Sequence, residues 1–317
     1  MACLCTNYSE RAFMTIGGSG DSRPSKNQRR DAVRTKAKRI REEQKKKDRR
    51  YRVALRSGIA VAGVAIAAVI AVVIINSIPP VGPGPANMAS DGVLISEGMT
   101  PVTTSALQPE AKPIPSKPDA TGTVADIRVY ADYLCPFCSE FDAANSDQIS
   151  QWVTSGAATV EIHPVSILTH KSSGTKYSLR AANAAACVAN YAPANFYDFN
   201  AILFQEQPKE GTAGHDDAAI KGLVKDAGVS DRVSQINACI DDTTFKSWVI
   251  ASTDRALSGP LPNTEVEAIT GTPTVLVNGK QYVGALDDPR EFAAFVLQAA
   301  GATYSTSTPT PEPAPAG

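Results

Sequence analysis

The sequence predicts an α/β domain that is interrupted by a helical insertion and preceded by a single transmembrane helix. The first observation is an apolar–polar alternation over 127–130, typical of a strand, followed at once by a helical pattern. The second is a long run of helical patterns, about 168–262, before a closing hairpin and helix. The third is an uncharged apolar stretch, residues 57–78, upstream of the predicted domain at 123–300.

The N-terminal segment, residues 1–56, is strongly basic. It carries 17 of the 31 Lys and Arg residues but only 6 of the 32 Asp and Glu residues, so the rest of the chain is acidic. This asymmetry indicates that the two parts occupy different environments. We expect a cytoplasmic segment that attracts anionic lipid headgroups, and we predict no nucleic-acid partner.

Residues 57–78 contain no charged residue. At about 1.5 Å per residue such a helix reaches roughly 33 Å, enough to cross a lipid bilayer. Because the basic segment ends directly before it, we predict a single-pass protein of the cell membrane with a cytoplasmic N-terminus. A buried core helix is one alternative, but it would rarely lack a polar face. A signal peptide cleaved near Ala86–Ser90 is another, although its apolar core is normally about 7–15 residues long.

Residues 79–122 are predicted to be a Pro-rich linker outside the membrane. Nine of the 22 prolines lie in this segment, which favours an extended, semi-rigid tether. The apolar run 92–96 interrupts it and predicts a first edge strand. The tail, 301–317, is rich in Thr, Ser and Pro and is predicted to be disordered.

The first half of the domain is predicted from its periodicity. After the strand at 127–130, apolar residues recur at helical spacing from Phe141 to Val153, until Ser155-Gly156 stops the pattern. A second strand follows at 160–163, where apolar and polar residues alternate again.

The second half begins with the helical block, which includes an aromatic helix over Phe196–Phe204. Two short strands, 274–277 and 281–283, flank Asn278-Gly279, a strong signal for a type I′ hairpin. Asp288–Glu291 has the form of a capping box that opens a final helix.

The chemistry is predicted at Cys135 and Cys138, which open the helix directly after the first strand. Pro136 suits the first helical turn because its missing N–H would be unpaired there. Free N–H groups and the helix dipole favour a thiolate at Cys135, the reactive form of the side chain. Cys138 lies one turn further in, where it can close a disulfide with Cys135. We therefore expect an exposed Cys135 sulfur that forms the mixed disulfide with a substrate and a more buried Cys138 sulfur that resolves it.

Three other interpretations of this pair remain open. Zinc would need four ligands, and no second CxxC or CxxH is present, so we expect neither a metal nor a cofactor. An inert disulfide explains poorly why the pair opens a helix, and Cys135 can also act simply as a helix cap. Asp132 lies three residues before Cys135. It could shift the pKa values of the thiols or relay a proton to them; the alternative is that it stabilises a turn at the end of the strand.

Gly271–Thr274 is the second informative site, since Pro273 directly precedes a predicted strand. It is either a strand-start proline in a turn or a cis-proline loop packed beside the cysteines, and sequence alone does not decide between them.

Three motifs resemble the DsbA-like branch of the thioredoxin superfamily: Asp132–Cys138 (DYLCPFC), Phe196–Gln207 (FYDFNAILFQEQ) and Gly271–Lys280 (GTPTVLVNGK). The similarity covers about 123–300. It implies a thioredoxin fold interrupted by a helical domain, with Pro273 cis beside the two cysteines.

The resemblance also implies the roles of the site residues. Cys135 would be the nucleophile, Cys138 the resolving thiol and Thr272-Pro273 the substrate-facing loop. Pro136 and Phe137 complete the active-site motif. Because strongly oxidising members of this branch carry His at the position of Phe137, and Phe cannot donate to a thiolate, we expect a milder oxidant.

Of the other four cysteines, Cys3 and Cys5 lie in the predicted cytoplasmic segment, where we expect free thiols, and Cys187 and Cys239 lie in the helical block. In an oxidising compartment two leftover cysteines usually pair, so we predict a structural disulfide worth about 4 kcal/mol. Two buried free thiols are the alternative.

We therefore predict an enzyme, an extracytoplasmic protein thiol–disulfide oxidoreductase that forms disulfides in secreted or membrane proteins. Its partners would be unfolded or reduced secreted proteins, the lipid bilayer and a separate membrane reoxidant implied by the resemblance. A reductase or isomerase using the same couple is an alternative, as is an anchored binding module with a purely structural disulfide. The oligomeric state stays open.

Overall fold

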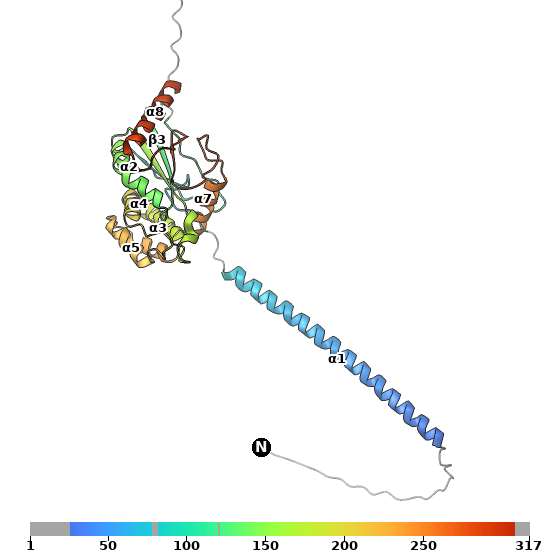
Figure 1. Cartoon of the computed structure of the whole chain (residues 1–317). Helices are drawn as coiled ribbons and strands as arrows, with labels where there is room; N and C mark the ends of the chain where they lie inside the picture. The colour runs from blue at the N-terminus through green and yellow to red at the C-terminus, as the bar shows by residue number, and fades with distance from the viewer. Residues whose placement is uncertain (1–25, 78–81, 120, 308–317) are drawn as a thin grey trace, which may run out of the picture. The chain divides into compact units, whose positions relative to one another are not determined.

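The computed structural model describes residues 26–77, 82–119 and 121–307 (Figure 1). The chain divides into two compact units, Met1–Pro79 and Pro80–Gly317. In the first unit, α1 (Lys26–Ser77) is one continuous helix of 52 residues. Within the described residues, no helix combines the length and the apolarity that crossing a membrane requires. The predicted anchor, 57–78, stays a prediction, because its side chains and Ile78 lie outside the described residues.

The second unit is built on a mixed six-stranded sheet in the order β2-β1-β4-β3-β5-β6. Its two long central strands, β3 and β4, are parallel, and every other neighbouring pair is antiparallel. The strands are β1 (Val93–Ser96), β2 (Thr100–Pro101), β3 (Ala125–Ala131), β4 (Ala158–Pro164), β5 (Thr274–Val277) and β6 (Lys280–Gln281).

Helices follow the strands in the predicted order of strand, helix, strand, helical block, hairpin and helix. Five helices lie between β4 and β5, so the predicted insertion is present, and Figure 1 shows α3, α4 and α5 gathered at one end of the domain. The helices are α2 (Pro136–Thr154), α3 (Tyr177–Tyr191), α4 (Phe196–Gln205), α5 (Asp217–Asp226), α6 (Val233–Asp241), α7 (Lys246–Ser258) and α8 (Pro289–Ser307). Short 3-10 turns occur at Glu97–Met99, Ile167–Lys171 and Pro193–Asn195.

Strand β3 is buried on both faces, which its alternating sequence does not suggest. Ile127 and Val129 belong to the main core, together with apolar residues of α2 and α8. Arg128 points to the other face, because strand side chains alternate. Its guanidinium lies 3.2 Å from Asp126 and 3.1 Å from Glu161. The polar position is therefore buried because these carboxylates neutralise it.

The structure corrects the predicted linker, 79–122. Residues 82–119 pack on the domain: Met88 and Val93 are fully buried, and β1 pairs with β4. The expected first strand forms, but the two-residue β2 occupies the edge. Proline content indicates only that this segment is not helical. The apolar residues within it decide that it binds the sheet, because their burial removes them from water.

The closing hairpin and helix agree with the sequence prediction in most details. Asn278 and Gly279 have φ values of 49° and 76°, as the type I′ turn requires. Asp288 Oδ1 accepts a hydrogen bond from the backbone N of Glu291 at 3.3 Å, but the Glu291 carboxylate turns to the backbone N of Ala285. Only half of the predicted capping box therefore forms.

The boundary of the predicted tail, 301–317, is also corrected. Helix α8 continues to Ser307, so the first seven residues of this segment are helical. Residues 308–317 lie outside the described part of the chain.

Candidate active site

Cys135 is the N-cap of α2, as predicted, with Pro136 in the first turn. Strand β3 ends at Ala131, and a short turn follows in which the backbone N of Cys135 donates to Asp132 O at 2.9 Å. Cys135 and Cys138 are both free thiols. The helix start therefore places both sulfurs in the first turn of α2, where the N–H groups are unpaired.

Burial does not distinguish the two thiols, contrary to the expectation of one exposed sulfur. Cys135 is 4% exposed and Cys138 is 2% exposed. Phe137, which lies between the two cysteines in the sequence, is 59% exposed. The two cysteines differ in the hydrogen bonds around their sulfurs and in how strongly burial raises their pKa values.

The surroundings of Cys135 favour its thiolate. A hydrogen bond from the Cys138 thiol is the main reason why the pKa of Cys135 falls from 9.0 to about 6. Burial opposes this shift, while hydrogen bonds from the Thr272 side chain and from the backbone N–H groups of Cys138 and Phe137 add to it. A thiol with this pKa is largely ionised at neutral pH and is therefore nucleophilic.

Cys138 has the opposite character. Burial is the main cause of a pKa well above the usual value for a thiol, and the hydrogen bond to Cys135 raises it further. At neutral pH the negative charge therefore resides on Cys135. Cys138 keeps its proton and donates a hydrogen bond to the Cys135 sulfur. Such an arrangement provides an attacking thiolate and a latent second nucleophile.

The Thr272-Pro273 loop lies directly against the pair. The Thr272–Pro273 peptide bond is cis, as the resemblance implies, and Cys135 Sγ lies 3.1 Å from Thr272 O. Pro273 lines a small cavity together with Cys138. The interpretation left open by the sequence is therefore resolved in favour of the cis-proline loop beside the cysteines.

Two hydrogen bonds connect the helical insertion to the first turn of α2. Gln207 Nε2 donates to Cys135 O at 3.0 Å, and Ser139 Oγ donates to Phe204 O at 3.1 Å. Sequence reasoning missed the role of Gln207, because it lies 72 residues from Cys135 and a glutamine after a helix carries no local signal of such a contact.

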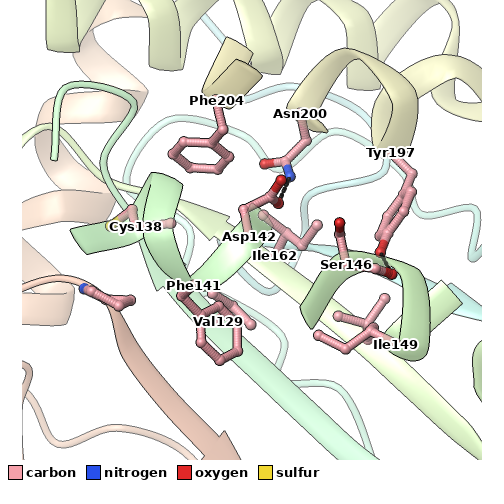
Figure 2. Close-up of a pocket in the computed structure, with 13 residues that line it drawn as sticks. Val129, Cys138, Phe141, Asp142, Ser146, Ile149, Ile162, Tyr197, Asn200 and Phe204 are labelled. Atoms are coloured by element: carbon pink, nitrogen blue, oxygen red, sulfur yellow. Dashed lines mark hydrogen bonds between the residues drawn. The ribbon is translucent and has the colours of Figure 1, made fainter. Parts of the chain in front are cut away.

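A cavity of about 30 Å³ lies next to Cys138, between α2, α4 and the sheet (Figure 2). Asp142 of α2 projects toward it and accepts a hydrogen bond from Asn200 Nδ2 at 3.3 Å (Figure 2). Tyr133 in turn donates its hydroxyl proton to Asn200 Oδ1 at 3.0 Å. Burial raises the pKa of Asp142 to about 7, and the hydrogen bond from Asn200 opposes the shift. The sequence prediction overlooked this carboxyl.

Asp132 has the structural role that the sequence left open. It is fully buried, and its carboxylate accepts hydrogen bonds from Leu134 N at 2.9 Å, Leu168 N at 2.8 Å and Ser178 Oγ at 2.8 Å. These bonds hold the turn between β3 and α2 and leave the carboxylate fully engaged.

The predicted Cys187–Cys239 disulfide is present and joins α3 to α6. Asn183 supports it: its side-chain nitrogen donates to Cys239 O at 3.4 Å, and its oxygen accepts from Phe245 N at 2.8 Å. The bridge is buried in the insertion and serves packing. Within the described ranges, no group of three His, Cys, Asp or Glu side chains is arranged to hold a metal ion.

Known proteins resemble this chain over its folded part. The thioredoxin family profile matches residues 117–296, more than half of the chain. Reduced DsbA of Mycobacterium tuberculosis is 27% identical, with a TM-score of 0.47 over 69% of this chain and 100% of that one. Reduced DsbG, a disulfide bond oxidoreductase of the same species, is 26% identical, with a TM-score of 0.49 over 70% and 96%. Oxidised BdbD of Bacillus subtilis is 20% identical, with a TM-score of 0.48 over 70% and 100%. No curated protein sequence matches the chain.

Proposed function

The chain belongs to the thioredoxin family, and on this premise we propose that it is a protein thiol–disulfide oxidoreductase working through Cys135 and Cys138. The observation that carries the proposal is the unequal ionisation of two adjacent thiols at the start of α2. The pKa of Cys135 is lowered to about 6, whereas that of Cys138 is raised. An inert structural pair has no need of this difference, but disulfide exchange does.

The reaction balances as a sequence of exchanges. In the oxidised enzyme, a substrate thiolate attacks Cys135 Sγ, breaks the Cys135–Cys138 bond and forms a mixed disulfide, while Cys138 leaves as a thiol after taking up a proton. A second substrate thiolate then attacks the substrate sulfur and expels Cys135 as a thiolate. Two electrons pass from the substrate to the enzyme, and the low pKa of Cys135 makes it a good leaving group.

The proposed direction is oxidation of substrate cysteines. A stabilised thiolate favours the reduced enzyme and therefore makes the disulfide form an oxidant. The lowered pKa of Cys135 is in line with an oxidant, and Phe137 in the motif is in line with a milder one, because Phe cannot donate a hydrogen bond to the thiolate. A reductase or isomerase using the same couple is the second candidate, and the exposed Phe137 suits it equally as a contact for unfolded chains.

The proposed location is outside the membrane, with residues 57–78 as an anchor and 1–56 in the cytoplasm. The charge asymmetry of the sequence supports this topology. The Cys187–Cys239 bridge supports an oxidising compartment, where structural disulfides persist. The proposed partners are reduced secreted proteins and a separate membrane protein that reoxidises Cys135 and Cys138.

Two assays side by side test the proposal. The oxidised protein should restore activity to reduced, unfolded ribonuclease, and it should do so faster than it reduces insulin in the presence of dithiothreitol. Cys135→Ser should abolish both activities. Faster insulin reduction would favour the reductase, and unchanged refolding by the Cys135→Ser variant would favour a binding module.

A further inference from the structure

The exchange reaction raises a question of proton transfer at Cys138. When this thiol leaves or re-forms the disulfide, its sulfur gains or loses a proton in a site that is 2% exposed. An uncompensated thiolate at such a site is costly, as the raised pKa of Cys138 indicates. A nearby group that exchanges protons would lower this barrier.

Asp132 is poorly suited to that task, because three hydrogen bonds already engage its carboxylate. Asp142 carries the only carboxyl group among the residues that line the cavity beside Cys138. Cys138 and Asp142 are four residues apart on α2, so their side chains lie on the same face of the helix, with Cβ atoms about 5–6 Å apart.

The cavity provides the connection between them. Its volume of about 30 Å³ exceeds the roughly 10–15 Å³ that one water molecule requires. Cys138, Asp142, Ser146 and Asn200 line it, so a water molecule there has polar partners (Figure 2). The Tyr133–Asn200–Asp142 chain of hydrogen bonds orients the carboxyl toward this space.

Asp142 also has a route to solvent. A second pocket, a groove of about 290 Å³ between α2 and α4, shares Asp142, Ser146 and Phe204 with the cavity. The groove is further lined by Ser139 and Asp147. The Asp142 carboxyl therefore lines both the cavity beside Cys138 and the groove that opens to solvent.

We propose that Asp142 exchanges protons with the Cys138 thiol through water in this cavity, and with solvent through the groove. When Cys138 leaves, the carboxylic acid gives it a proton. When Cys138 attacks the mixed disulfide at Cys135, the carboxylate takes the proton, the Cys135–Cys138 bond forms and the substrate leaves as a thiolate. This inference rests on the proposed exchange at Cys135 and Cys138 and assigns one further residue to it.

The charged surroundings of Asp142 suit this task. A pKa of about 7 keeps both protonation states populated at neutral pH, the condition for a group that both gives and takes protons. The titratable groups around it are Cys138 and Asp147 on α2, Tyr133 in the turn after β3, and Tyr197 on α4. Burial raises the pKa of both tyrosines, so they stay neutral and do not compete near pH 7.

Stopped-flow reaction of the full-length Cys3→Ser, Cys5→Ser variant, reduced at Cys135 and Cys138, with an excess of 5,5′-dithiobis(2-nitrobenzoate) tests the proposal, because Cys3 and Cys5 would otherwise also release thionitrobenzoate. The first thionitrobenzoate released reports attack by Cys135, and the second reports attack by Cys138 on the mixed disulfide. Asp142→Asn should slow the second phase by about tenfold or more near pH 7 and remove its dependence on pH around 7. The first phase should stay unchanged. Asp142→Glu should keep the second phase within about threefold.

Glu140→Gln is the matched control, since Glu140 lies on the same helix but is exposed, and it should leave both phases unchanged. In a Cys138→Ser background, Asp142→Asn should have no effect on the first phase. Equal slowing of both phases would assign Asp142 a merely structural role, and an unchanged second phase would refute the proton exchange. If the Cys3→Ser, Cys5→Ser variant with Cys135, Cys138 and Asp142 intact releases no thionitrobenzoate, the proposed function itself fails.

Discussion

The two cysteine pairs of the domain are almost equally buried but differ in chemistry. Cys187 and Cys239 are 0% and 3% exposed and form a bridge, while Cys135 and Cys138 are 4% and 2% exposed and are free thiols. Cys187 lies inside α3, where the helix satisfies its own N–H groups, and Cys135 caps α2. The comparison shows that exposure does not separate the pair proposed as reactive from the structural one, and that the two pairs differ in their position, one at the start of a helix and the other inside helices.

The largest expected difference between the pairs is in reactivity. After mild reduction at pH 7, iodoacetamide should label Cys135 faster than Cys187 or Cys239 by about two orders of magnitude or more, because Cys135 is stabilised as a thiolate whereas Cys187 and Cys239 form a buried bridge. Peptide mass spectrometry of the labelled chain would measure the rates. Comparable labelling of Cys187 would break the comparison.

Removal of the structural bridge should affect stability and not exchange. The Cys187→Ala, Cys239→Ala double variant should lose about 4 kcal/mol of unfolding free energy, since the bridge closes a loop of 52 residues. Urea denaturation followed by circular dichroism would measure this loss. Ribonuclease oxidation per folded molecule should stay unchanged, and a selective loss of that activity would show that the bridge acts on the site.

The pH dependence of Cys135 sharpens the same contrast. Its alkylation rate should rise about tenfold between pH 5 and pH 8 and level off above about pH 6–7, because the pKa is about 6. A thiol with the usual pKa of 9.0 would continue to gain reactivity through pH 8.

The same shift has a consequence for stability. A lowered folded-state pKa means that the reduced protein gains stability relative to the oxidised protein as pH rises from about 6 toward 9, and loses it as pH falls through about 6. Thermal unfolding of both redox forms across this range would measure the difference. An equal pH response of the two forms would contradict the assigned thiolate.

The smallest expected effect concerns the contact between the insertion and the site. Gln207→Ala removes the hydrogen bond to Cys135 O and loosens the first turn of α2, so the pKa of Cys135 should rise by about 0.5–1 unit. Thiolate absorbance at 240 nm would follow this titration. Gln205→Ala changes an exposed glutamine of the same segment and should leave the pKa unchanged.

Much of the fold was predictable because its signals are local. The alternation before Cys135, the Asn278-Gly279 turn and the helix stop at Ser155-Gly156 each depend on a few neighbouring residues, and the structure confirms them. The position of Cys135 at a helix start is local in the same sense. It was enough to select Cys135 and Cys138 as the pair that we propose to be reactive.

The errors have a common cause. The sequence predicts a semi-rigid linker over 79–122, interrupted by one edge strand, yet Met88 and Val93 dock the described residues 82–119 on the sheet through contacts that composition does not reveal. The tail was predicted to begin at 301, yet α8 extends to Ser307. In both cases the conformation of the segment depends on its neighbours: residues 82–119 pack against the sheet, and residues 301–307 continue the helix that begins at Pro289.

By itself the sequence determined the order of strands and helices, the position of the Cys135–Cys138 pair at a helix start and the basic N-terminal segment, because each is encoded within a short stretch of chain. Only the tertiary structure decided that Gln207 would donate a hydrogen bond to the carbonyl of Cys135 and that burial would raise the pKa of the half-buried Asp142. It also placed Thr272 against Cys135, 137 residues away, as the resemblance implies. The physical reason is that burial and long-range hydrogen bonds depend on how distant segments meet, and these set the ionisation of each group.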